Sequence, residues 1–143
     1  MSLLGQYDDQ NVFAKIMRGE MPCVKIFEDN IIISIMDAFP QAKGHVLVIP
    51  KAPSRNLLEM SGQDIEPLFK RVQQIAKAVS AALTPDGIII TQFNGAPAGQ
   101  TVFHTHVHII PRYEGTNLSS HSGGNMADMD ELQKTANLII EKL

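Results

Sequence analysis

The chain has 143 residues, of which 44% are hydrophobic and 19% are charged, and its formal net charge is −3. This length predicts one domain, residues 1–143, with enough apolar side chains for a hydrophobic core. The slight acidic excess argues against a partner nucleic acid, whose phosphates need clustered Lys and Arg side chains. It does not argue against a small anionic ligand held by a few local donors.

A single cysteine, Cys23, excludes an intramolecular disulfide, and we expect a small packed side chain there rather than a nucleophile. No apolar run approaches the ~18 residues that a membrane span needs, and the first residues lack the pattern of a signal peptide. We therefore expect a cytoplasmic protein with no membrane partner.

The first half of the chain predicts one short helix and three strands. Residues 11–20 favour a helix that ends near Gly19. Residues 23–29 and 31–37 are rich in β-branched side chains, and their tight connection at Asp29-Asn30 predicts a hairpin. Residues 44–51 predict a further strand.

The longest periodic segment, residues 61–87, predicts an amphipathic helix because its apolar side chains recur at helical spacing. Ser61 and Asp64 are both suited to cap its start. Pro67 has no backbone N–H and is tolerated only near the start of a helix, which favours Asp64 as the cap.

The remaining segments complete an α+β fold. Residues 87–93 predict a buried strand and residues 101–111 a fifth strand, while residues 115–125 are typical of a mobile loop. A second long helix is expected from about Asp128 to the end of the chain. Short connections between most strands predict a five-stranded antiparallel sheet with two main helices.

Three of the five histidines, His104, His106 and His108, occupy every second position of the predicted fifth strand. Side chains alternate between the faces of a strand, so the three imidazoles share one face at intervals of roughly 6.7 Å. The opposite face is suited to a core; its members are Phe103, Thr105, Val107 and Ile109.

Three interpretations of these histidines compete. They are half-exposed polar positions, metal ligands, or groups that handle phosphate. Two of them with another ligand such as His45 could bind zinc, but the three together span about 13 Å and cannot converge on one ion without distortion. Phosphate chemistry suits them better, because a neutral imidazole is a nucleophile and crowded imidazoles resist simultaneous protonation. The preceding glycine-rich residues 94–101 could aim backbone N–H groups at an anion.

The segment HTHVHII resembles the His-φ-His-φ-His-φ-φ signature of the histidine triad superfamily, in which φ is an apolar residue, except that Thr105 occupies the first φ position. The resemblance extends to VFAKIMRGEMPCVKIFED, MDAFPQAKGHVLVIPK and FNGAPAGQTVFHTHVHIIPR. It covers roughly residues 11–112 and leaves residues 113–143 as a C-terminal loop and helix. It implies a histidine-triad-like fold whose sheet pairs with that of a second copy, giving a homodimer with a ten-stranded sheet.

The resemblance also implies an activity, the hydrolysis of a purine nucleotide at its α-phosphate without a cofactor. By resemblance His106 is the nucleophile and becomes transiently nucleotidylated, the His104 carbonyl orients it, His108 contacts the phosphate, and His45 supports the triad. Further residues are implied as nucleotide-binding: Phe13 and Ile16 beside the purine, Asp37 with Ala38 at the ribose, and Asn94, Gly99, Gln100 and Thr101 near the phosphate or leaving group.

Two departures from the family pattern matter. Many bacterial relatives have two cysteines of a structural zinc site where this chain has Asn11 and Ala14, so we expect no metal here. The loop before the histidines has Pro97 and Ala98 at positions where relatives vary, so the sequence does not define the leaving group. We expect a nucleotide phosphoramidase; a dinucleoside polyphosphate hydrolase and a nucleotide-binding partner protein with incidental hydrolysis remain alternatives. His121 matches no motif and is expected to be solvated.

Overall fold

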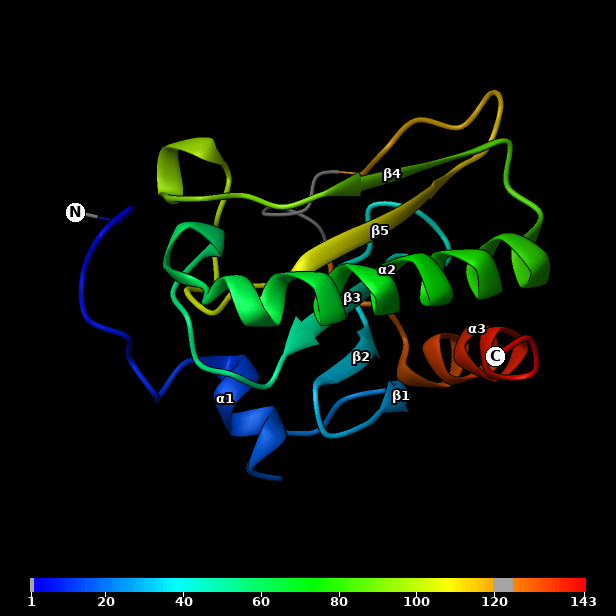
Figure 1. Ribbon diagram of the computed structural model, residues 1–143. Coiled ribbons are helices and arrows are strands. Elements are labelled where there is room, and N and C mark those ends of the chain that lie inside the picture. Colours follow the sequence, from blue (N-terminus) through cyan, green and yellow to red (C-terminus); the bar gives the residue numbers. More distant parts are fainter. Residues whose placement is uncertain (1, 120–124) are drawn as a thin grey trace.

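The computed structural model describes residues 2–119 and 125–143, so His121 and part of the expected mobile loop lie outside the described residues. Its centre is a five-stranded sheet in the order β1-β2-β3-β5-β4, and all neighbouring strands are antiparallel (Figure 1). The strands are β1 (Lys25–Glu28), β2 (Ile32–Met36), β3 (Val46–Pro50), β4 (Gly87–Thr91) and β5 (Val107–Arg112). The predicted sheet and its hairpin at Asp29-Asn30 are confirmed.

The helices are α1 (Val12–Met17), α2 (Gly62–Leu83) and α3 (Met129–Ile140), with short 3-10 turns η1 (Leu57–Glu59) and η2 (Ala96–Ala98). Helices α2 and α3 pack together over one face of the sheet, and α1 lies near the opposite face (Figure 1). Within the described residues, no helix has both the length and the apolar character needed to cross a membrane.

The sheet has an apolar core on each face. The larger core joins the sheet to α2 and α3, and the smaller one joins the other face to Phe13 of α1. Strand β3 shows the alternation, since Val46 and Val48 belong to the larger core while Leu47 and Ile49 belong to the smaller one. In β5, Val107 and Ile109 face the larger core, which directs His108 toward the α1 face.

Two sequence predictions about the second half are wrong. The strand expected to be buried, β4, is the edge of the sheet, and Ile90 is 48% exposed. The cap of α2 is Ser61, whose side chain accepts a hydrogen bond from the Gln63 N–H at 3.3 Å. Pro67 therefore lies inside the helix, where it removes the bond to the carbonyl of Gln63, an exposed residue whose carbonyl can be satisfied by water.

The fifth strand is also shorter than predicted, because it begins at Val107 and residues 101–106 form an irregular segment. His104 and His106 are thus outside the sheet ladder. The segment is held in part by Thr105, whose N–H donates to the Ser54 carbonyl at 2.9 Å. Other contacts must fix the two histidines, and they come from side chains.

Candidate active site

The three histidines gather on the α1 face as the alternation predicts. His104, His106 and His108 are all buried, and the ring centroids of His106 and His108 lie 4.9 Å apart. The Phe13 ring meets the His106 ring edge-on at 4.8 Å. Of the residues predicted to face the other way, Val107 and Ile109 are in the larger core, and Thr105 is buried against Ser54. Phe103 is the exception, because it lies half-buried beneath the Arg55 guanidinium, 4.5 Å from its ring centroid.

The tautomer of His106 follows from its hydrogen bond to His104. The Nδ1 atom of His106 lies 2.7 Å from the His104 carbonyl oxygen. A carbonyl oxygen only accepts, so Nδ1 carries the hydrogen and the lone pair of the neutral ring is on Nε2. This is the arrangement that a histidine nucleophile needs.

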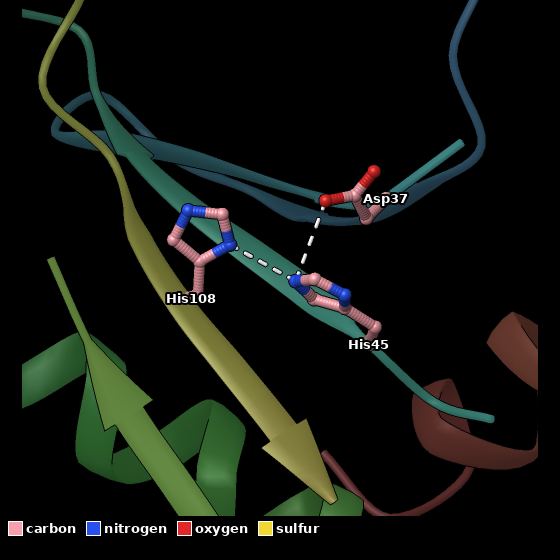
Figure 2. Close-up of side chains that lie close together, drawn as sticks. All are labelled: Asp37, His45 and His108. Carbon is pink, nitrogen blue, oxygen red and sulfur yellow. Dashed lines mark hydrogen bonds and ion pairs between the residues drawn. The ribbon is translucent and has the colours of Figure 1, made fainter. Parts of the chain in front are cut away.

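A second chain of hydrogen bonds reaches His108 from the loop between β2 and β3 (Figure 2). The Gln41 N–H donates to Nδ1 of His45 at 3.0 Å, so in the neutral ring Nε2 carries the hydrogen. That Nε2 lies 2.9 Å from Nδ1 of His108 and 3.3 Å from Oδ2 of Asp37. His108 therefore accepts at Nδ1 and carries its hydrogen on Nε2, which makes it a hydrogen-bond donor suited to a phosphoryl oxygen.

Gly44 sets the position of His45. Its φ is +88°, in the left-handed region that favours glycine, and an added Cβ would overlap the Leu83 side chain at the end of α2. The loop backbone at Gly44 thus lies directly against the Leu83 side chain. His45 follows immediately, is fully buried, and leads into β3.

Among residues 2–119 and 125–143, Asp37, His45 and His108 are grouped closely enough to hold a metal ion. One potential ligand atom from each lies within 4.8 Å of the others. However, the 2.9 Å between the two histidine nitrogens is a hydrogen-bond distance, shorter than the about 3.3 Å that separates ligands around tetrahedral zinc. A carboxylate and two imidazoles are ligands that zinc accepts, but the distance between the two imidazole nitrogens fits a hydrogen bond from His45 to His108.

The positions of the two family cysteines hold no metal ligand. Asn11 caps α1, and its Oδ1 accepts from the Ala14 N–H at 3.0 Å. Ala14 is buried and has no donor atom in its side chain. The absence of a structural metal stays a prediction. Cys23, the remaining thiol, is half-buried, and this burial raises the pKa of its thiol and so disfavours the thiolate.

The glycine-rich loop is organised by Gln100. Its buried side chain accepts from the Gly95 N–H at 2.8 Å and donates to the carbonyls of Arg55 and Val102. Asn94 likewise accepts from the Leu57 N–H at 3.1 Å. Both side chains therefore shape the loop, and their contact with a phosphate stays a prediction. Gly99 and Thr101 are exposed beside them.

The residues predicted for the nucleoside lie on two elements. Phe13 is buried against the triad and Ile16 packs half-buried on the smaller core. Asp37 is 5% exposed, and its Oδ1 accepts from the Phe39 N–H at 2.8 Å. Ala38 follows it, half-buried. Asp37 contacts His45 in the structure. Its contact with a ribose stays a prediction.

Sequence reasoning missed two aromatic residues of this region, Phe93 and Tyr7. The Phe93 ring meets the His108 ring edge-on with centroids 5.4 Å apart. The hydroxyl of Tyr7 lies 2.5 Å from Nδ1 of His104, and the Nε2 of that ring lies 2.7 Å from the Pro50 carbonyl oxygen. Burial lowers the pKa of His104, which the Pro50 carbonyl partly opposes, so the ring is held neutral. No sequence motif marks Tyr7. The nearest signal is Asn11, a residue type that caps helices, which predicts the start of α1 four positions after Tyr7.

The antiparallel sheet and the three buried histidines on its α1 face define a small α+β protein with a histidine triad. Comparison with known proteins agrees. A model of the HIT domain matches residues 18–115. The chain belongs to the HIT domain family, as the resemblance predicted.

Solved and curated relatives extend this result. The crystal structure of a Hit-like protein from Bartonella henselae, involved in cell-cycle regulation, superposes with a TM-score of 0.91 at 45% identity over 97% of this chain and 100% of that one. Adenylylsulfatase HINT3 of Arabidopsis thaliana is 43% identical over 72% of this chain, which spans only 52% of that protein. Adenosine 5'-monophosphoramidase hnt1 of Schizosaccharomyces pombe is 37% identical over 71% of this chain and 73% of its own length.

Proposed function

We propose that this protein is a nucleotide hydrolase that cleaves nucleoside 5'-phosphoramidates at the α-phosphate through a nucleotidyl-His106 intermediate. The observation that carries the proposal is the hydrogen bond from Nδ1 of His106 to the His104 carbonyl, because it puts the lone pair on Nε2. The names of two relatives, an adenylylsulfatase and a monophosphoramidase, support chemistry at an adenylyl phosphorus.

In the first step the Nε2 lone pair of His106 forms a bond to phosphorus while the phosphorus–nitrogen bond of the substrate breaks, and the leaving amine takes up one proton from the solvent. The histidine ring, now bonded at Nε2 and still protonated at Nδ1, becomes positively charged. The His104 carbonyl oxygen accepts from that N–H and stabilises the charge.

In the second step water attacks the phosphorus and gives up one proton to the solvent, the bond to Nε2 breaks with its electron pair returning to the ring, and the nucleoside monophosphate leaves with His106 restored. His108 donates from its Nε2–H to a phosphoryl oxygen in both steps, where negative charge grows in the transition state. Asp37 with Ala38, and Phe13 with Ile16, are proposed to bind the ribose and the purine. Gly99 and Thr101 at the loop surface are proposed to meet the leaving group.

The substrate class is tested by turnover. Wild-type protein should hydrolyse adenosine 5'-phosphoramidate, and His106→Ala should lower kcat by on the order of 1,000-fold or more because the nucleophile is lost. Adenylyl sulfate and a diadenosine polyphosphate, assayed in parallel, identify the preferred leaving group. Tight AMP binding with no turnover of any of the three would contradict the proposal and favour a nucleotide-binding partner protein.

We further propose that the protein is a homodimer. Strand β4 is a sheet edge, and the groove between it and α2 is lined by apolar side chains, among them Phe69, Ile88 and Ile90. Pairing of two such edges would give a ten-stranded sheet and cover Ile90. Light scattering should give the dimer mass for wild type and the monomer mass for Ile90→Asp. Leu58→Asp, at a 65% exposed position on η1, is the matched control and should stay dimeric.

A further inference from the structure

In the part of the segment before α1 that the structure describes, Tyr7 contacts the triad. This residue precedes the matched family region, residues 18–115. Its ring meets the His104 ring edge-on with centroids 5.6 Å apart, and its hydroxyl lies 2.5 Å from Nδ1 of His104. The side chain is half-buried, and burial raises the pKa of Tyr7, an effect that the hydrogen bond from Asn11 partly opposes.

The direction of each proton along this contact can be assigned. Pro50 offers only a carbonyl oxygen, so the neutral His104 ring carries its hydrogen on Nε2 and accepts at Nδ1. Asn11 uses Oδ1 to accept from the Ala14 N–H, which fixes Nδ2 as the atom that donates to the Tyr7 oxygen at 2.9 Å. The single hydroxyl hydrogen of Tyr7 is therefore donated to His104.

This bond matters because His104 lies outside the sheet ladder, which begins at Val107. Its side chain is anchored at both ring nitrogens, by Tyr7 on one side and Pro50 on the other. The carbonyl of the same residue accepts from Nδ1 of His106 at 2.7 Å. Anchoring the ring thus fixes the backbone group that orients the nucleophile.

We propose that Tyr7 is a positioning residue for His106. The Pro50 carbonyl sets the tautomer of His104, and the Tyr7 hydroxyl holds its ring in one orientation. The anchored ring fixes the His104 carbonyl, which holds His106 with Nε2 as the nucleophilic atom. The catalytic consequence rests on the proposed function. Tyr7 is not a catalytic residue, because its only hydroxyl hydrogen is committed to His104.

Asn11 extends this contact to α1. Its Nδ2 donates to Tyr7 and also to the Asp8 carbonyl at 2.7 Å, while its Oδ1 caps the helix that carries Phe13. Phe13 in turn packs on His106. The hydroxyl of Tyr7 therefore joins two contacts with the nucleophile, one through the His104 backbone and one through the start of α1.

The test is Tyr7→Phe, which keeps the ring and removes the hydroxyl. Tyr113→Phe is the matched control, because its hydroxyl donates to the Lys43 carbonyl and does not contact the triad. With ¹⁵N-labelled histidine, NMR of the ligand-free wild type should show His104 protonated at Nε2 and His106 at Nδ1. Tyr7→Phe should change the ring-nitrogen shifts of both residues, of His104 because Nδ1 loses its donor and of His106 because the carbonyl that accepts from its Nδ1 is held less firmly. Tyr113→Phe should leave these shifts unchanged.

Kinetics give the second readout. Tyr7→Phe should lower kcat for adenosine 5'-phosphoramidate roughly fivefold to tenfold, the loss of about one hydrogen bond, with KM unchanged. Unchanged nitrogen shifts or an unchanged kcat would overturn the inference, as would a raised KM alone or a Tyr7→Phe chain that fails to fold. Wild-type protein inactive on every substrate would overturn the proposed function, while the nitrogen shifts would still decide whether Tyr7 positions the two rings.

Discussion

Two hydrogen-bonded arms flank His106, and they differ in origin and in task. The first arm runs from Asn11 through Tyr7 to His104 and ends on Nδ1 of the nucleophile. The second runs from Asp37 through His45 to His108, the residue proposed to donate to phosphate. The first arm places the lone pair of His106 on its Nε2, and the second places the hydrogen of His108 on its Nε2.

Backbone groups set the tautomers of three rings in this site. The Pro50 carbonyl decides the His104 ring, the His104 carbonyl decides the His106 ring, and the Gln41 N–H decides the His45 ring. A backbone group cannot change its donor or acceptor character, so each ring has one neutral form that fits. Changes that break one arm should therefore leave the other intact.

Among changes that keep His106, the largest effect is expected at the end of the second arm. His108→Ala removes the proposed donor to the phosphoryl oxygen and should lower kcat/KM roughly 100-fold, the usual loss for one donor to a developing charge. Steady-state kinetics on adenosine 5'-phosphoramidate measure it. A loss smaller than about threefold would show that the second arm does not act on the phosphate.

Gly44→Ala tests the support of that arm. The new Cβ meets Leu83 and the backbone must keep a φ of +88°, so the free energy of unfolding should fall by about 2 kcal/mol. Urea unfolding measures the change, and Gly19→Ala, with φ +78° but open space around the added Cβ, separates the strain of φ from the overlap. Equal losses in the two variants would show that contact with α2 contributes nothing.

His45 tests whether the second arm works through a hydrogen. His45→Leu removes the donor to Nδ1 of His108 and should lower kcat roughly tenfold, about 1.4 kcal/mol. His45→Gln can still donate from its amide and should recover part of the rate. If Leu and Gln gave the same rate, packing rather than the hydrogen bond would be the role of His45.

The smallest effect concerns pH and the first arm. Burial lowers the pKa of His104 below its usual 6.5, so the unfolded chain binds this proton more readily than the folded one. The contribution of His104 to stability is present above pH 6.5 and is lost as the pH falls toward its folded pKa. The free energy of unfolding should therefore fall between pH 7.5 and 5.5, by up to about 1.4 kcal/mol per pH unit from this residue. In His104→Gln that slope should be smaller, and an unchanged slope would contradict a neutral His104.

Much of the fold was predictable from the sequence, and the failures have physical causes. An apolar run such as that of β4 is compatible with both a buried strand and an edge strand. Periodicity alone therefore could not place β4 at the edge of the sheet. Ser61 and Asp64 are both good caps, and the choice of Ser61 depends on a helix that tolerates Pro67. The period of two grouped the histidines correctly although His104 and His106 are not in the strand.

The site was predictable only where residue type carries a signal. His45 and Asp37 follow from their spacing in a family motif, and the structure places them beside His108. Contact of Gln100 with the phosphate or leaving group stays a prediction. Its hold on the loop backbone was not foreseen, and it arises because a buried amide must satisfy its own donors and acceptor. Tyr7 has no such signal, since it is 97 positions from its partner and only the folded chain brings the two together.

The central claim, covalent catalysis by His106, is tested most directly by intact-protein mass spectrometry after rapid quenching with adenosine 5'-phosphoramidate. Wild type should gain the mass of one adenylyl group transiently, and His106→Ala should not. Product formation by wild type without any adduct, or an equal adduct in His106→Ala, would contradict the assignment of His106 as the nucleophile.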